Sequence, residues 1–155
     1  MMREIIYSKS EAETENIAYN LAQRIQPGDI IALNGEMGAG KTAFTSGFMR
    51  FFAPSVRVTS PTFALVNQYE YEMEEMSENG FSGSVFHFDM YRINGEEDLL
   101  SIGFYDYLDR DDILIIEWFK NIRDFFDEHT VEIDIIKTGD TSREIIFERV
   151  RELRG

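Results

Sequence analysis

The spacing of apolar and polar residues changes along the chain, and each kind of spacing predicts a different kind of element. Residues 30–33 and 113–116 are entirely apolar, which is typical of strands covered on both faces. Residues 131–137 and 143–149 alternate apolar and polar side chains, as the two strands of a closing antiparallel hairpin do. Further extended segments are expected at 3–7, 56–59, 63–71 and 84–89. The acidic stretch at 70–78, with Asn79-Gly80 after it, predicts the tip of a long hairpin.

Helical spacing appears between these segments. Ser10 is a good N-cap for a helix that runs to about Arg24. The apolar face expected for this helix consists of Ala12, Ile17, Ala18, Leu21, Ala22 and Ile25. A second helix is expected from Lys41 to about Phe52, where Pro54 ends it. Shorter helical turns are expected at 96–102, at 103–108 and, more weakly, at 118–126.

Composition and charge limit the classes of function. A chain of 155 residues with 43% hydrophobic and 14% aromatic residues predicts one folded domain, residues 1–155. The absence of cysteine excludes disulfides, thiolate metal sites and a thiol nucleophile. A net charge of -14 argues against direct, stable binding of a nucleic acid and favours either a well-solvated surface or the steering of a basic partner. The N-terminus lacks a signal-peptide pattern and no apolar run is long enough to span a membrane, so a cytoplasmic location is expected.

The strongest chemical signal follows the first all-apolar strand. The sequence Gly35-Glu36-Met37-Gly38-Ala39-Gly40-Lys41-Thr42 matches the phosphate-binding pattern G-x-x-x-x-G-K-[ST] at every fixed position. Glycines let the backbone turn successive N–H groups toward one anion, and the N-terminus of the following helix adds partial positive charge. Lys41 is then expected at the β- and γ-phosphates, and the Thr42 hydroxyl at Mg²⁺. The pattern predicts a nucleoside triphosphate site.

Two acidic residues are candidates for the metal side of such a site. Glu117 ends the apolar run 113–116, and Asp89 ends the strand predicted at 84–89. A phosphate-binding loop is usually complemented by an acid at the end of a neighbouring strand. We expect one of the two carboxylates near Mg²⁺ and the other orienting the attacking water.

Other candidate residues admit two interpretations. The hydroxyl-rich segment Thr59-Ser60-Pro61-Thr62 suits either a γ-phosphate sensor or a simple turn stabilised by serine and threonine hydroxyls. His87 is either a general base or a structural histidine. Arg92 either approaches phosphates or pairs with an acid, and Trp118 either stacks on a base or packs in the core.

Four motifs in this order resemble the TsaE family: GEMGAGKT, SPTFALVNQY, HFDMYR and IEW. The resemblance extends from about Ser10 to Arg149, and the last three motifs together are specific to this family of small P-loop ATPases of bacterial tRNA threonylcarbamoyladenosine synthesis. It implies a P-loop NTPase-like three-layer α/β fold with a mixed parallel and antiparallel sheet. It also implies slow, Mg²⁺-dependent ATP hydrolysis and action on the TsaD–TsaB pair, which modifies adenosine 37 of tRNA.

The resemblance also assigns residues. It implies phosphate and metal roles for Lys41 and Thr42, and acidic roles for Glu117 and Asp89. It implies a switch-like loop at Ser60, Pro61 and Thr62. It also implies a place near the nucleotide for Trp118 and, more loosely, a place near the adenine for Thr14. Ala43 stands where many members carry a second threonine, which leaves the Thr42 hydroxyl in place.

Three other classes of function compete with this one. A small-molecule kinase would need an arginine-bearing lid, for which the chain has little room. A GTPase would need an N-K-x-D motif, which the sequence lacks. A nucleotide-gated scaffold without significant turnover differs from a slow ATPase only in rate, so the sequence leaves that alternative open.

Overall fold

The structure is a computed structural model that describes residues 3–59, 61, 66–72, 82–108, 111–117 and 130–149. The predicted helix at 118–126 and the tip of the predicted hairpin therefore lie outside the described residues. Among the described helices, none is long and apolar enough to cross a membrane.

One seven-stranded sheet organises the chain, in the order β1-β7-β6-β2-β5-β4-β3. Parallel pairs form the middle of the sheet. The strand β2 (Ile30–Asn34) pairs with both β5 (Ile113–Glu117) and β6 (Thr130–Lys137), and β5 also pairs with β4 (Ser82–Asp89). Antiparallel pairs lie toward the two edges. At one edge β7 (Arg143–Arg149) lies between β1 (Arg3–Ser8) and β6, and at the other β3 (Val66–Glu72) pairs with β4. The predicted closing hairpin and the long hairpin of β3 and β4 are confirmed, and the sheet is mixed as expected.

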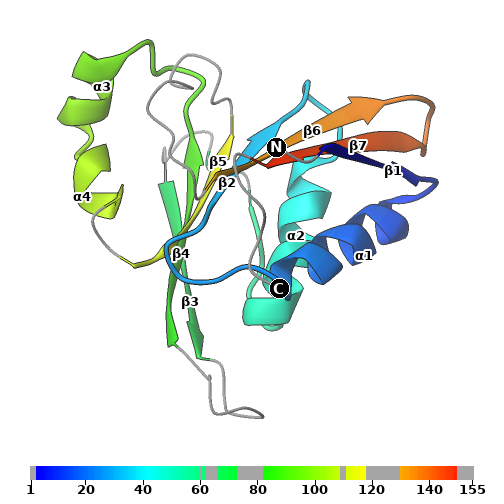
Figure 1. Cartoon of the computed structure of the whole chain (residues 1–155), viewed down its shortest axis with the longest axis horizontal. Coiled ribbons are helices and arrows are strands. Elements are labelled where there is room, and N and C mark those ends of the chain that lie inside the picture. The colour runs from blue at the N-terminus through cyan, green and yellow to red at the C-terminus, as the bar shows by residue number, and fades with distance from the viewer. Residues whose placement is uncertain are drawn as a thin grey trace.

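Helices cover both faces of this sheet and make three layers (Figure 1). The helices α1 (Glu11–Ala22) and α2 (Lys41–Phe52) pack on one face, and α3 (Glu96–Ser101) with α4 (Phe104–Leu108) on the other. Because side chains alternate along a strand, Ile31 and Leu33 of β2 enter the first core while Ile30 and Ala32 enter the second. The all-apolar runs are thus strands buried on both faces, as the sequence predicts.

Helix α1 begins where expected but faces the core slightly differently. The Ser10 side chain accepts a hydrogen bond from the backbone N–H of Glu13 at 3.1 Å, as an N-cap does. The prediction that Ala12 belongs to the buried face is wrong, because Ala12 is exposed and Thr14 turns inward instead. Two residues advance a helix by roughly 200°, so Thr14 and Ala12 cannot share one face. The Thr14 hydroxyl is hydrogen-bonded to Ser8 Oγ at 2.7 Å. This hydrogen bond offsets the cost of removing the hydroxyl from water.

The segment 56–59, predicted as extended, is not a strand of the sheet. Side chains of β3 take the place of a neighbouring strand there. The Tyr69 hydroxyl accepts from the Thr59 N–H at 3.3 Å, and Asn67 Nδ2 donates to the Thr59 carbonyl at 3.1 Å. The backbone of Thr59 is therefore anchored to the hairpin without joining its ladder.

A glycine in α2 brings the first two helices into close contact. A Cβ atom built on Gly47 would lie 2.1 Å from the Glu15 carbonyl oxygen of α1.

In an open helix, replacing glycine by alanine stabilises a protein by roughly 0.5–1 kcal/mol. We expect Gly47→Ala to lower the free energy of unfolding by about 2 kcal/mol instead, because α1 must move away. Gly95→Ala, where a Cβ meets nothing within 4 Å, is the matched control. Urea unfolding of both variants checks this expectation, and equal stabilities would contradict it.

Candidate functional site

The predicted functional residues gather at one edge of the sheet, where parallel strands end. In the strand register, Glu117 at the end of β5 lies opposite Leu33 of β2 on one side and Asp89 of β4 on the other. The loop 35–40 leaves the end of β2 at the same edge and leads into α2. Open α/β sheets bind ligands in the crevice outside the carboxyl ends of their strands. The register alone therefore brings the loop and both acids together.

The loop 35–40 depends on glycine at two positions for different reasons. Gly40 has φ +111°, a left-handed conformation that other residues rarely adopt, and its carbonyl accepts the first helical hydrogen bond from Phe44 N at 2.9 Å. Gly35 passes so close to β6 that a Cβ would lie 3.0 Å from the Ile135 carbonyl oxygen. The loop is thus pressed against the sheet and ends directly at the N-terminus of α2.

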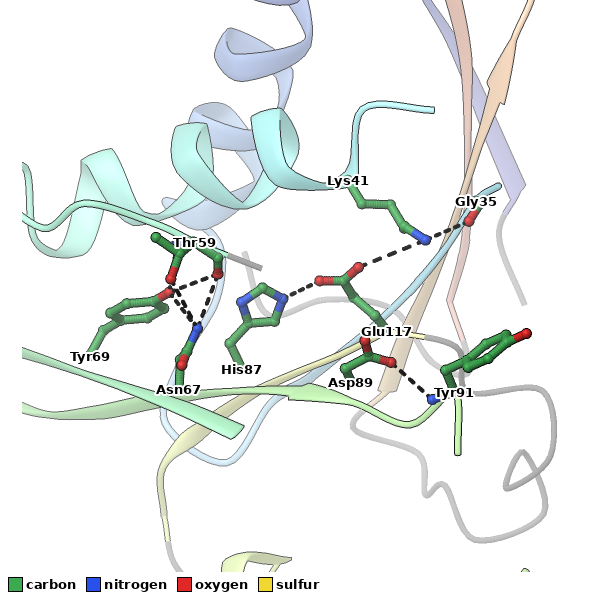
Figure 2. Close-up of polar contacts among 9 residues, drawn as sticks. All are labelled: Gly35, Lys41, Thr59, Asn67, Tyr69, His87, Asp89, Tyr91 and Glu117. Atoms are coloured by element: carbon green, nitrogen blue, oxygen red, sulfur yellow. Dashed lines mark hydrogen bonds and ion pairs between the residues drawn. The ribbon is translucent and has the colours of Figure 1, made fainter. Parts of the chain in front are cut away.

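Lys41, the first residue of α2, points back across the loop (Figure 2). Its Nζ donates a hydrogen bond to the Gly35 carbonyl at 2.6 Å and lies 3.8 Å from Glu117 Oε1. Burial lowers the pKa of Lys41 from its usual value, and the nearby Glu117 and Asp89 carboxylates partly oppose that shift. The Lys41 ammonium group therefore lies between the Gly35 carbonyl and the Glu117 carboxylate, at the bottom of the site.

Glu117 is held between Lys41 and a histidine of the neighbouring strand. Its second carboxylate oxygen, Oε2, is hydrogen-bonded to Nε2 of His87, a side chain that is 0% exposed. Because a carboxylate only accepts, His87 Nε2 carries the proton and donates it in this contact. His87 Nδ1 is buried with no hydrogen-bond partner among the described residues. Of the two interpretations of His87, the geometry favours a positioning partner of Glu117.

Asp89 is buried beside this pair and is oriented by a hydrogen bond from a nearby backbone N–H. Its Oδ1 accepts a hydrogen bond from the Tyr91 N–H at 2.9 Å. The turn that follows is fixed to β5, because the Met90 N–H donates to the Glu117 carbonyl at 2.9 Å. Arg92, the next candidate, is exposed. A backbone hydrogen bond of its own turn therefore fixes the orientation of the Asp89 carboxylate.

A cavity of about 600 Å³ opens above these groups. Many predicted residues line it: Thr14, Met37, Gly38, Gly40, Lys41, Thr42, Ala43, Asp89 and Glu117. Gly35, Glu36 and Ala39 instead line a neighbouring hollow of about 550 Å³, which the loop shares with residues of β6. Ser60, Thr62 and Trp118 lie outside the described residues.

Sequence reasoning missed four residues of the larger cavity. Glu11 comes from the start of α1, Asp140 and Thr141 come from the turn between β6 and β7, and Arg143 is the first residue of β7. Sequence pattern offered no signal for them, because the hairpin reaches the loop only through the order of strands in the sheet. Their presence gives the cavity a second wall.

The donor groups of the cavity suit a small, hard cation. A threonine hydroxyl and two carboxylates, from Thr42, Asp89 and Glu117, line the same space. In the described part of the chain, no group of three or more His, Asp or Glu side chains is arranged to hold a metal by itself. Magnesium commonly takes one or two carboxylates and completes its shell with water and phosphate oxygens. The residues present fit that sparse coordination.

The three-layer mixed sheet, the glycine-rich loop at the start of α2 and the buried strand-end acids define an α/β protein of the P-loop NTPase class. The chain belongs to the TsaE family, because the profile of threonylcarbamoyl adenosine biosynthesis protein TsaE matches residues 8–145. Proteins of this family belong to tRNA threonylcarbamoyladenosine biosynthesis.

Individual relatives agree with this assignment. A TsaE protein of Bacillus subtilis is 33% identical over 138 residues, covering 89% of this chain and 80% of its own. A TsaE protein of Rickettsia typhi is 33% identical over 127 residues, 81% of each chain. The crystal structure of Bacillus subtilis YdiB superposes with a TM-score of 0.73 at 27% identity, over 97% of this chain and 87% of that one.

The contact between His87 and Glu117 can be tested by a double-mutant cycle. His87→Leu leaves a buried carboxylate oxygen without its donor, so we expect a loss of about 2 kcal/mol in the free energy of unfolding. Replacing both residues by leucine should cost clearly less than the sum of the two single changes, as for residues in direct contact. Urea denaturation of the four proteins gives the coupling. Additive single effects would show that the two side chains do not depend on each other.

Proposed function

We propose that this protein binds ATP with Mg²⁺ and hydrolyses it slowly, as the component required for threonylcarbamoyl modification of adenosine 37 in tRNA by the TsaD–TsaB complex. The observation that carries the proposal is the approach of Lys41 Nζ to Glu117 Oε1, at 3.8 Å, on the floor of the cavity at the loop 35–40. A lysine and a buried acid at this place are the two groups that phosphoryl transfer requires from a P-loop protein.

Phosphate binding is assigned to the loop and the first turn of α2. Residues Gly35 to Thr42 surround the phosphates with backbone N–H groups, and the positive end of the α2 dipole favours the anion. Lys41 turns its ammonium from the Gly35 carbonyl toward the phosphate oxygens. This exchange of one oxygen partner for another keeps the buried charge hydrogen-bonded throughout.

Catalysis is assigned to the two strand-end acids. Thr42 and one of the two carboxylates would hold Mg²⁺, which when bound neutralises charge on the phosphates. The other carboxylate would orient the attacking water and accept its proton. His87 keeps the Glu117 carboxylate in one orientation, so that the acid does not rotate away from the cavity.

The remaining assignments concern the base, the switch and the partners. Thr14, Met37 and Ala43 line the cavity and are proposed to contact the nucleoside end of ATP. Ser60, Thr62 and Trp118 are proposed from the family motifs as γ-phosphate and nucleotide contacts. The net charge of -14 supports action through protein partners rather than stable tRNA binding. The proposed location is the cytoplasm.

The decisive experiment measures ATP hydrolysis with and without TsaD and TsaB. We expect partners to raise the rate, and Glu117→Gln to lower the stimulated rate by at least about 100-fold while ATP still binds, because the change removes an acid or base and keeps the side-chain shape. The control is Glu148→Gln, an acid of β7 that pairs with Arg3 of the edge strand β1.

The outcomes separate the parts of the proposal. Equal rates for Glu117→Gln and Glu148→Gln would remove Glu117 from the catalytic machinery. ATP binding without turnover under any condition would favour the nucleotide-gated scaffold, and phosphorylation of an acceptor would favour a kinase. A wild-type rate that ignores both partners would contradict the assigned complex.

The lowered pKa of Lys41 predicts a pH dependence of nucleotide affinity. Phosphate binding needs the protonated ammonium, and a lowered pKa means that this proton is lost before the pH reaches the usual lysine value. Affinity for ATP should therefore already fall as the pH rises toward the usual lysine pKa of 10.5. Lys41→Arg, whose guanidinium stays charged, should show a flat profile over the same range. Titration of a fluorescent ATP analogue measures both, and parallel profiles would contradict the assignment.

A further inference from the structure

Arg143, the first residue of β7, joins the turn between β6 and β7 to the loop 35–40. Its Nε donates to the Ala39 carbonyl at 2.6 Å and its Nη2 to the Gly38 carbonyl at 3.3 Å. Its Nη1 donates to the carbonyls of Gly139 and Ser142 at 3.1 and 2.8 Å. One guanidinium group thus connects two backbone segments that lie about a hundred residues apart in the sequence.

The contact with Ala39 fixes the direction of the next backbone donor. In a planar trans peptide, the carbonyl and the following N–H point in opposite directions. Because the Ala39 carbonyl faces Arg143, the N–H of Gly40 faces away from it. The neighbouring Ala39 N–H is already used within the loop, where it donates to the Glu36 carbonyl at 3.0 Å. Arg143 therefore fixes the orientation of the peptide group between Ala39 and Gly40 within the loop.

The same residue supplies charge where the cavity needs it. The four acceptors of Arg143 are neutral carbonyls, so its guanidinium charge is not cancelled by these contacts. Among the described residues that line the cavity, the cations are Lys41 and Arg143, and the carboxylates are Glu11, Asp89, Glu117 and Asp140. An anion site with this excess of acids depends on both cations.

We propose that Arg143 is a positioning residue that presets the loop 35–40 for the α- and β-phosphates of the nucleotide. The proposal rests on the nucleotide site described under Proposed function and adds a residue from the distant hairpin to it. The role differs from that of an arginine that contacts the γ-phosphate, because here the guanidinium forks bind protein backbone.

The test compares Arg143→Ala and Arg143→Lys with Arg50→Ala. Arg50 also joins distant segments, since it bonds Asn16 and pairs with Glu15 on α1, but it does not line the cavity. Two readouts are needed: dissociation constants for ADP and for ATP, and hydrogen–deuterium exchange of a peptide covering 35–42 in the protein without nucleotide.

We expect Arg143→Ala to weaken ADP and ATP equally, by about tenfold, which corresponds to about 1.4 kcal/mol. Exchange in 35–42 should be faster, because the Ala39 and Gly38 carbonyls lose their partner. Arg143→Lys should recover only part of the affinity, since an ammonium lacks the planar fork that spans both segments. Arg50→Ala should leave both readouts unchanged even where it lowers the melting temperature.

Several results would overturn the proposal. A loss confined to ATP would indicate a direct γ-phosphate contact, and full recovery by lysine would show that charge alone matters. Unchanged affinity or unchanged exchange in Arg143→Ala would show that the bridge does not set the loop. If the wild-type protein bound neither nucleotide, the proposed function would fail, whereas the exchange comparison would still decide whether Arg143 orders the loop.

Discussion

The buried carboxylate of Glu117 is the constraint on which the rest of the site depends. A charged group at this depth is stable only where its oxygens have partners, and here Lys41 and His87 supply one contact each. Both partners reach it because of the strand register. A slip of β5 by one residue would turn Glu117 to the opposite face, into the core around Leu99 and Phe104. The parallel pairing of β2, β5 and β4 is thus fixed by hydrophobic residues and by this ion pair together.

The contacts of Glu117 continue along the sheet to a second polar cluster. The ring centroids of His87 and Tyr69 lie 6.5 Å apart. The Tyr69 hydroxyl in turn contacts both the N–H and the carbonyl of Thr59 (Figure 2). Thr59 is the first residue of the hydroxyl-rich segment 59–62. A continuous chain of packed side chains therefore connects the floor of the cavity with the start of that segment. Such contiguous networks are the physical means by which two sites can influence each other.

The sequence predicted the elements that local rules determine. Buried strands, the N-cap at Ser10 and the loop before Lys41 each carry their signal within a few residues, and the structure confirms these elements. Contacts between distant segments had no such signal. The hydrogen bond of His87 to Glu117 exists only in one register of β4 and β5, and the reach of Arg143 to Ala39 spans 104 residues of sequence. Thr14 replaced Ala12 on the inner face because Ser8 offers it a hydroxyl partner.

The acidity of the chain also takes on a more specific meaning at the site. A net charge of -14 opposes any polyanion that approaches from a distance, yet salt limits this repulsion to roughly 8 Å at physiological ionic strength. Within that distance, a nucleotide bound as proposed would meet Lys41, Arg143, the backbone donors of the loop and the positive end of α2. A triphosphate is small enough to lie within reach of these groups, whereas most phosphates of a tRNA molecule would lie beyond them. The charge of the chain therefore supports the proposal of a nucleotide ligand, with recognition of the tRNA assigned to the partner proteins.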